Sequence, residues 1–171
     1  MRESIRSVTP DFNTQRMVQE YAERLYVPAA KSHEDFSRDN CGAATQLSQW
    51  KTQMRKDWPQ VQISDVQVAN KDRQNILVGE SLEISARVHL GAVDPKHVRV
   101  EAYHGEADNS DIRNPTATVL NQSSQADGNG NYSYQGSVPA SESGTYGFSV
   151  RVVPTHPNLM QAHELRLITW S

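Results

Sequence analysis

Apolar residues in the first sixty positions recur every three or four residues, which is the spacing of one helix face. A first helix is predicted over residues 13–25, with Asn13 as its N-cap. We expect it to end at Val27-Pro28, because the residue before a proline is pushed out of the helical region. Its apolar stripe consists of Met17, Val18, Tyr21 and Leu25.

A polar stretch, residues 31–40 (KSHEDFSRDN), follows and has little to bury. It is predicted to be a bridge to a second helix over residues 43–57. Cations crowd the last turns of that helix, where they complement the helix dipole, and Trp58-Pro59 ends it. Its apolar face consists of Leu47, Trp50 and Met54.

From residue 61 the apolar spacing changes to two, the period of a half-buried strand. The clearest alternations cover residues 82–90, 98–102 and 146–152. The phase shifts between Ile63 and Val66, as a β-bulge would allow. The sequence DGNGN at residues 127–131 predicts a hairpin, since Gly and Asn tolerate the positive φ of such turns.

About seven short strands with no helical pattern between them favour an immunoglobulin-like antiparallel β-sandwich. A parallel α/β sheet is disfavoured, because it would need helical crossovers. The expected fold class is therefore α+β, with N-terminal helices followed by the sandwich over residues 61–171.

Composition narrows the classes of partner. The formal net charge is -3 and the pI about 6.1, which argues against nucleic acid as a partner. No apolar run approaches the roughly 20 residues that span a bilayer, and the first residues lack the apolar stretch of a secretory signal. The single cysteine fits a reducing compartment, so we expect a cytoplasmic protein.

Candidate chemistry is sparse. His156 and His163, with Glu164 adjacent, lie in one loop and would form either a metal site or a solvated polar loop. Cys41 is either a nucleophile near a helix start or an inert small residue. There is no phosphate-binding loop, G-x-S-x-G or dinucleotide fingerprint. No catalytic, cofactor-binding or metal-binding residue is predicted in this chain.

Three tyrosines are candidates for carbohydrate contact. Tyr132 and Tyr134 share one face of a predicted strand, and that face lies either in the core or outside. An outward pair would make a small ligand platform. The same two interpretations apply to Tyr103.

Three stretches are more specific than composition. Residues 4–30 (SIRSVTPDFNTQRMVQEYAERLYVPAA) resemble the final helical segment of the catalytic domain in the shorter, bacterial and archaeal branch of α-glucan (glycogen-type) phosphorylases. Residues 143–170 (SGTYGFSVRVVPTHPNLMQAHELRLITW) resemble the closing strands of the β-domain that follows it. Residues 98–105 (VRVEAYHG) are similar to an internal strand of that domain.

The resemblance implies a division into three parts: residues 1–30 as the last helix of a catalytic domain, residues 31–60 as bridge and second helix, and residues 61–171 as the β-domain. The family transfers a glucosyl unit from an α-1,4-glucan to phosphate and uses pyridoxal phosphate, which a lysine binds as a Schiff base. No lysine here follows a Gly/Ser-rich turn, so no cofactor residue carries over. The partners implied are the upstream catalytic lobes.

Three alternative functions are therefore considered for this chain. The first is a C-terminal portion of an α-glucan phosphorylase without catalysis of its own. The second is a stand-alone module that binds α-glucan through tyrosine or tryptophan. The third is a structural module that self-associates through the apolar stripe of the first helix.

Overall fold

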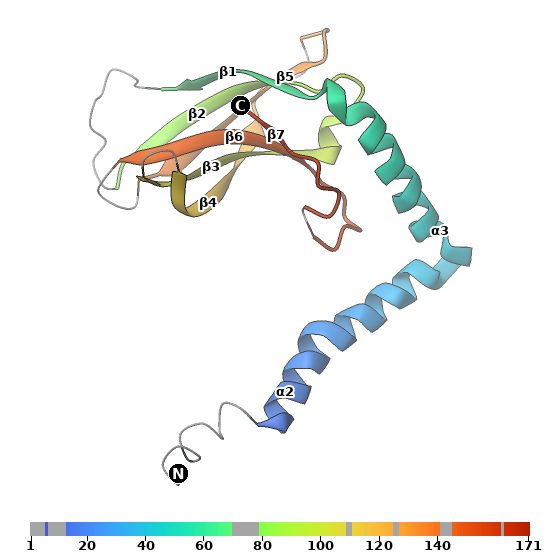
Figure 1. Ribbon diagram of the computed structural model, residues 1–171. Coiled ribbons are helices and arrows are strands. Elements are labelled where there is room, and N and C mark those ends of the chain that lie inside the picture. The colour runs from blue at the N-terminus through green and yellow to red at the C-terminus, as the bar shows by residue number, and fades with distance from the viewer. Residues whose placement is uncertain are drawn as a thin grey trace. The chain divides into compact units, whose positions relative to one another are not determined.

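The computed structural model describes residues 6, 13–69, 79–108, 111–124, 127–140, 145–161 and 163–171. The chain divides into two compact units, Met1–Trp50 and Lys51–Ser171. Helices make up the described part of the first unit, and a β-sheet dominates the second (Figure 1).

The first unit begins with α2 (Thr14–Tyr21), whose N-cap is Asn13 as predicted. The Asn13 side chain accepts a hydrogen bond of 2.8 Å from the backbone N–H of Arg16. A π-helical turn, η1 (Ala22–Tyr26), leads into α3 (Val27–Asp57). The helical chain therefore runs on from one element into the next.

The predicted helix end at Val27-Pro28 is wrong, because α3 continues through both residues. Proline donates no backbone hydrogen bond, and its ring crowds the carbonyl four residues earlier. The π turn lies directly before it, with the N–H of Val27 bonded to the carbonyl of Ala22. This wider turn lets the helix pass the proline.

The predicted polar bridge over residues 31–40 also needs correction, since the helix continues through most of it. Arg38 pairs with Glu34 at 2.8 Å and with Asp35 at 3.4 Å. Charge pairs at this spacing support a helix that buries little. The helical dihedrals fail only from Arg38 to Cys41, where Asp39, Asn40 and Cys41 have φ of 51°, 55° and 62°. α3 therefore consists of two helical stretches: the first extends through most of the predicted bridge, and the second, after Cys41, is the predicted second helix.

The end of α3 is confirmed at Asp57, where a short 3-10 helix η2 (Trp58–Gln60) follows. In the second unit, Met54 and Trp58 are buried, with 4% and 6% of their surface exposed. Leu47, in the first unit, is buried as well. The apolar positions predicted for the second helix thus include real core residues.

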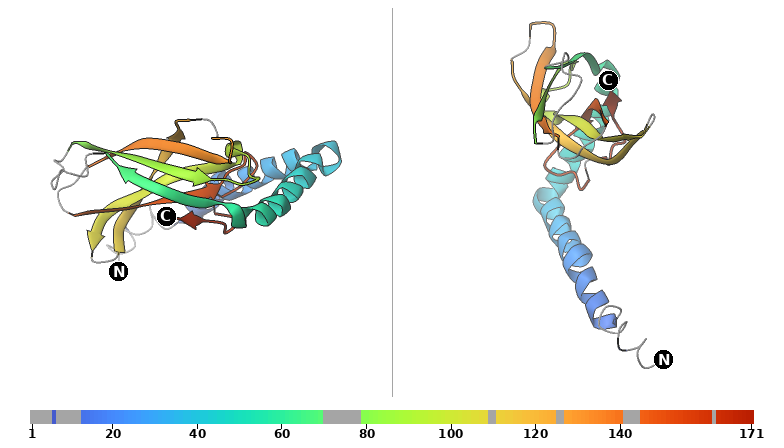
Figure 2. Two further views of the ribbon diagram at one scale, coloured as in Figure 1. Left: turned by 90° about the horizontal axis from the view of Figure 1, so that it is seen from above. Right: turned by 90° about the vertical axis from the view of Figure 1, so that its left-hand side faces the viewer.

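The second unit contains an antiparallel sheet in the strand order β1-β2-β5-β4-β3-β6-β7 (Figures 1 and 2). Its open ends approach each other, because β1 lies close to β6 and β7. The sheet is therefore nearly closed and barrel-like. Its elements are β1 (Gln62–Val68), β2 (Ser81–His89), η3 (Pro95–His97), β3 (Val98–Asp108), β4 (Asp111–Gln122), β5 (Asn131–Pro139), β6 (Tyr146–Pro154) and β7 (Thr169–Trp170).

Helices followed by an antiparallel β-domain are confirmed, but the division into two separate immunoglobulin-like sheets is not shown. The reason is β4, which pairs with β3 along most of its length and with β5 through Asn121 and Gln122. One strand thus joins what would otherwise be two sheets. The interior is filled by alternate residues of the strands, among them Ile84, Ala86, Val88, Val100, Ala102, Leu120, Val150 and Val152.

Two local predictions are confirmed. The register between β1 and β2 shifts between Ser64 and Gln67, and Asp65 has φ of 53°, so a bulge separates the two phases of β1. The turn between β4 and β5 is held by Asp127, which accepts hydrogen bonds from the backbone N–H groups of Asn129 and Asn131 at 3.0 and 3.3 Å. Gly128 and Gly130 have positive φ there.

Candidate functional site

Tyr103 lies on β3 and points to the outward face of the sheet. It alternates with the buried Ala102 and pairs with Ser149 of β6. Its ring meets the indole of Trp170 edge to face, with centroids 5.3 Å apart and an interplanar angle of 83°. Trp170 is 46% exposed and Tyr103 is half-buried, so the indole is the part of this pair that reaches solvent.

A guanidinium lies against both rings. The Cζ atom of Arg151 is 4.9 Å from the centroid of the Tyr103 ring and 5.5 Å from that of Trp170. Both distances lie within the range of a cation–π contact. Arg151 comes from β6, between β3 and β7, so its register opposite Trp170 creates the contact.

Glu101 orients this arginine. It precedes Tyr103 on the same face of β3, yet only 3% of its surface is exposed. One carboxylate oxygen accepts a hydrogen bond of 2.7 Å from Nε of Arg151, and the other accepts one of 2.6 Å from Nε of Arg99. A buried carboxylate between two arginines fixes both guanidinium groups, because each is held by a charge-assisted hydrogen bond.

Trp170 is held by its neighbour in sequence. The backbone N–H of Ser171 donates to the carbonyl of Val150 at 2.9 Å, and its hydroxyl accepts from the N–H of Val150 at 3.1 Å. The Ser171 hydroxyl also lies 3.2 Å from that of Ser149. β7 is therefore short but well anchored to β6, which places the indole.

Tyr132 and Tyr134 lie elsewhere, on β5. Tyr134 pairs with Ala86 and is 5% exposed, so the inward interpretation is confirmed for it. Burial, and to a lesser degree the neighbouring Tyr132, raise the pKa of Tyr134 to about 12. Among the described residues its hydroxyl has no hydrogen-bond partner. Tyr132 is half-buried.

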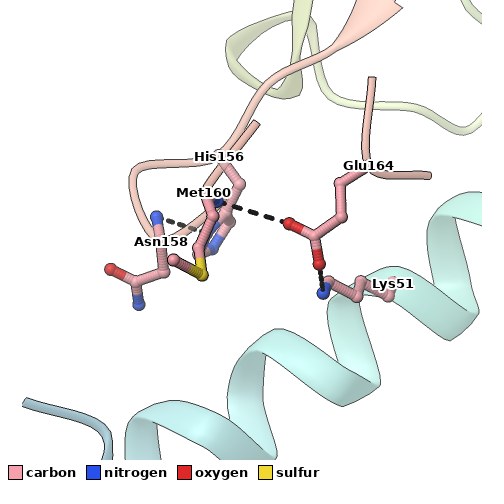
Figure 3. Close-up of polar contacts among 5 residues, drawn as sticks. All are labelled: Lys51, His156, Asn158, Met160 and Glu164. Atoms are coloured by element: carbon pink, nitrogen blue, oxygen red, sulfur yellow. Dashed lines mark hydrogen bonds and ion pairs between the residues drawn. The ribbon is translucent and has the colours of Figure 1, made fainter. Parts of the chain in front are cut away.

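The chain between β6 and β7 is tied to the last turns of α3 (Figure 3). Glu164 forms an ion pair with Lys51 of that helix segment and accepts a hydrogen bond of 3.3 Å from the N–H of Met160. The hydrogen bond from Lys51 holds the pKa of Glu164 below its usual range. Nδ1 of His156 accepts from the N–H of Asn158 at 3.1 Å, which closes a turn in the same loop.

The histidines do not assemble a metal site in the described part of the chain, where no group of three or more His, Cys, Asp or Glu side chains could hold an ion. His156 stacks on His97 with ring centroids 6.0 Å apart. Burial, with smaller effects from His97 and Lys51, lowers the pKa of His156. His163 is exposed, and so is Cys41.

The apolar stripe predicted for the first helix is exposed in this chain. None of the residues of α2 is buried. The exposed fractions are 48% for Met17, 54% for Val18, 47% for Tyr21 and 55% for Leu25. No helix in the described part of the chain is long and apolar enough to cross a membrane.

Sequence reasoning identified Tyr103 but missed its surroundings. The alternation of β3 places Glu101 and Tyr103 on one face, and this signal was available. The sequence does not reveal the register of β3, β6 and β7, which brings Arg151 and Trp170 beside Glu101 and Tyr103. Pairing between strands that are distant in sequence leaves no local pattern.

The sequence of this chain is similar to those of known proteins. Residues 58–171 match the family described as "Glycogen phosphorylase C-terminal domain". Over 170 residues, the chain is 30% identical to the glycogen phosphorylases of Mycobacterium bovis and Mycobacterium tuberculosis. Over 173 residues, it is 30% identical to the maltodextrin phosphorylase of Thermococcus litoralis.

Each of these matches covers 99% of this chain but 20% of the relative. The chain therefore spans about a fifth of the length of the curated relatives it matches. The family match begins at Trp58, directly after α3, and covers the β-sheet, and the relatives extend the likeness to the helical unit. This chain belongs to the glycogen phosphorylase C-terminal domain family.

Proposed function

We propose that this chain is the C-terminal portion of an α-glucan phosphorylase, which transfers a glucosyl unit from an α-1,4-glucan to phosphate and releases glucose 1-phosphate. The observation that carries the proposal is the likeness of nearly the whole chain to a fifth of enzymes named glycogen or maltodextrin phosphorylase. The remaining four fifths of such an enzyme would supply the catalytic lobes.

The lysines in the described part of this chain do not fit the pyridoxal phosphate that the parent family uses, and Lys71 lies outside that part. Lys31, Lys56 and Lys96 are exposed, and Lys51 is paired with Glu164. A lysine that forms a Schiff base needs an enclosed site, whereas three of these side chains are exposed and the fourth is held by a carboxylate. The cofactor would therefore belong to the catalytic lobes.

We expect no phosphorolysis from the chain alone. The test measures glucose 1-phosphate release from maltodextrin and phosphate with the chain, with a catalytic part that lacks this portion, and with the two mixed. Activity of the chain alone would contradict the assignment of the site to other lobes. A mixture no more active or stable than the catalytic part alone would contradict its role in the enzyme.

The helical unit would be the contact with the catalytic lobes. An exposed stripe of Met17, Val18, Tyr21 and Leu25 supports this role, because large exposed apolar patches mark interaction surfaces. In this proposal residues 1–30 end the catalytic domain, residues 31–60 connect, and residues 61–171 form the β-domain. The start of the family match at residue 58 supports the second boundary.

The finer fold of the β-domain is proposed as a variant of the immunoglobulin-like arrangement. The order β1-β2-β5-β4 beside β3-β6-β7 supports it, because these are the two sheets of that fold when its strands are numbered along the chain. A crystal structure with a different strand order would contradict this assignment.

A cytoplasmic location is proposed on the strength of the single cysteine. Fractionation of the source cells, with an antibody against the chain, tests it.

The second candidate function is a β-domain that binds α-glucan by itself. The exposed indole of Trp170 beside the half-buried ring of Tyr103 favours it. Tyr132 is half-buried as well, on β5, and Tyr134 lies almost wholly in the core. A third candidate is self-association through the helical stripe, which the same exposed residues support.

A further inference from the structure

The outward face of β3, β6 and β7 carries a small aromatic corner formed by Tyr103 and Trp170. The two rings stand almost at right angles, at 83°, and the indole is 46% exposed. A ring with an accessible face can stack on the C–H groups of a sugar, because aromatic side chains offer a large rigid apolar area at low entropic cost.

The corner is held in place before any ligand arrives. Arg151 lies against both rings, and the buried Glu101 bonds its Nε at 2.7 Å. Arg99 bonds the other oxygen of Glu101, and Ser171 anchors β7 to Val150. Groups that are fixed in advance lose little freedom on binding, which raises the affinity of a small site.

Polar groups surround the rings. The bond to Glu101 uses Nε of Arg151, and the guanidinium carries two further nitrogens that can donate. The hydroxyls of Ser149 and Ser171 lie 3.2 Å apart. Ser149 pairs with Tyr103 across the strands, and Ser171 follows Trp170 in sequence. A sugar needs this combination of an apolar surface and nearby donors and acceptors, since its rim is made of hydroxyl groups.

We propose that Tyr103, Trp170 and Arg151 form a binding site for α-1,4-glucan chains on the β-domain. This deepens the proposed function, on which the choice of glucan rests, because the relatives are named for glycogen and maltodextrin. Trp170 and Tyr103 stack on sugar rings, and Arg151 donates to their hydroxyls. Glu101 is a positioning residue that acts through Arg151.

The size of the corner favours a sugar over a protein. Two rings and one guanidinium cover one or two sugar units, whereas a stable protein interface buries about 800 Å² on each partner.

The experiment is affinity electrophoresis of the whole 171-residue chain in gels with and without glycogen, with calorimetric titration of maltoheptaose. Trp170→Ala and Tyr103→Ala are expected to weaken binding by at least about tenfold each, as truncated aromatic anchors do. Trp170→Phe keeps a ring and should restore part of the affinity. Arg151→Lys should weaken binding while it preserves the charge, because it lacks the planar fork.

The matched control is Val119→Ala, an exposed apolar residue of β4 that pairs with Glu101. It should bind within about twofold of the parent chain, an effect smaller than 0.5 kcal/mol. Circular dichroism and the unfolding midpoint must show that each variant folds. Cellohexaose, which is β-linked, serves as the linkage control and should bind more weakly.

Two results would overturn the site: no glycogen retardation of the folded parent chain, or equal retardation of the folded Trp170→Ala variant. Family membership would stand in either case, and the mixing assay of phosphorolysis tests the proposed function separately. The unmutated chain could also fail to bind glucan while Trp170→Ala weakens its association with the catalytic part. In that case the face is a protein contact and the proposal is wrong.

Discussion

Glu101 is the residue whose surroundings differ most from what its type would suggest. A carboxylate with 3% exposure on a sheet surface would be costly if it stood alone. Arg99 and Arg151 offset that cost with bonds of 2.6 and 2.7 Å. Such a group contributes fixed geometry more than net stability, because desolvation consumes much of the attraction between the charges.

Glu101→Ala is expected to lower the free energy of unfolding by about 3 kcal/mol, since it leaves Arg151, with a 13% exposed side chain, without its carboxylate. Urea unfolding measures the change. The matched control is Lys96→Ala, which breaks an exposed pair with Asp94 and should cost less than about 1 kcal/mol. Equal losses in the two variants would contradict the role of Glu101.

Tyr134 presents the opposite case, a buried hydroxyl without a hydrogen-bond partner among the described residues. Its pKa of about 12 exceeds that of an unfolded tyrosine, about 10. The folded chain therefore holds the proton more tightly, and stability falls as the pH rises from about 10 to about 12. Below pH 10 this residue gives no pH dependence.

Tyr134→Phe should remove part of that alkaline loss and be neutral or slightly stabilising at pH 7, because an unpaired polar atom leaves the core. Unfolding midpoints measured from pH 8 to 11.5 test this, with Tyr132→Phe as the control on the same strand. A Tyr134→Phe variant that loses stability at pH 7 would show that the hydroxyl has a partner.

At the scale of elements, the Lys51–Glu164 pair joins the end of α3 to the chain between β6 and β7 (Figure 3). Both residues belong to the second unit. The pair, the bond from Met160 and the turn at His156 give this long connection an ordered path. An ordered connection in turn sets where β7 begins and where Trp170 points.

Because Lys51 lowers the pKa of Glu164, the pair stabilises the fold at neutral pH. That contribution is lost as the pH falls through and below about 4.3, the ordinary value of a glutamate. Glu164→Gln should therefore flatten the loss of stability in acid, by less than about 1 kcal/mol for a pair this exposed. Urea unfolding between pH 3 and 7 tests it, with the exposed Glu83→Gln on β2 as the control. A parent-like acid slope in Glu164→Gln would contradict the prediction.

At the scale of the molecule, the chain combines a well-packed β-unit with a helical unit that buries little of its own surface. The residues of α2 and η1 are not buried. An apolar stripe without a covering surface favours association. The isolated chain should therefore behave differently from the same segment inside a longer phosphorylase.

We predict that the isolated chain forms dimers or larger species at high concentration and that Val18→Glu with Leu25→Glu makes it monomeric. Sedimentation velocity over a concentration series measures this. Gln15→Glu with Gln19→Glu adds the same charge away from the stripe and should leave the association unchanged. A strictly monomeric parent chain at high concentration would contradict the prediction.

The sequence by itself determined the type and order of most elements. The change of apolar spacing near residue 60 predicted helices and then strands, and the phase shift before Val66 predicted the bulge at Asp65. The turn at residues 127–131 also followed from its own residues. These features depend on contacts between near neighbours, so their signals are local.

The continuation of the helix through Pro28 and residues 31–37 was not predicted, because helix propensities describe single residues. The π turn before Pro28 and the ion pairs of the polar stretch, which offset the low propensities, are seen only in the structure. The pairing of β4 with both β3 and β5 was equally out of reach. So were the neighbours of Tyr103: Glu101, Arg151 and Trp170 meet only through the register of β3, β6 and β7. Sequence determined which residues share one face of a strand, and only the tertiary structure decided which face is outward and which residues meet there, because strand register is set by the packing of the whole core.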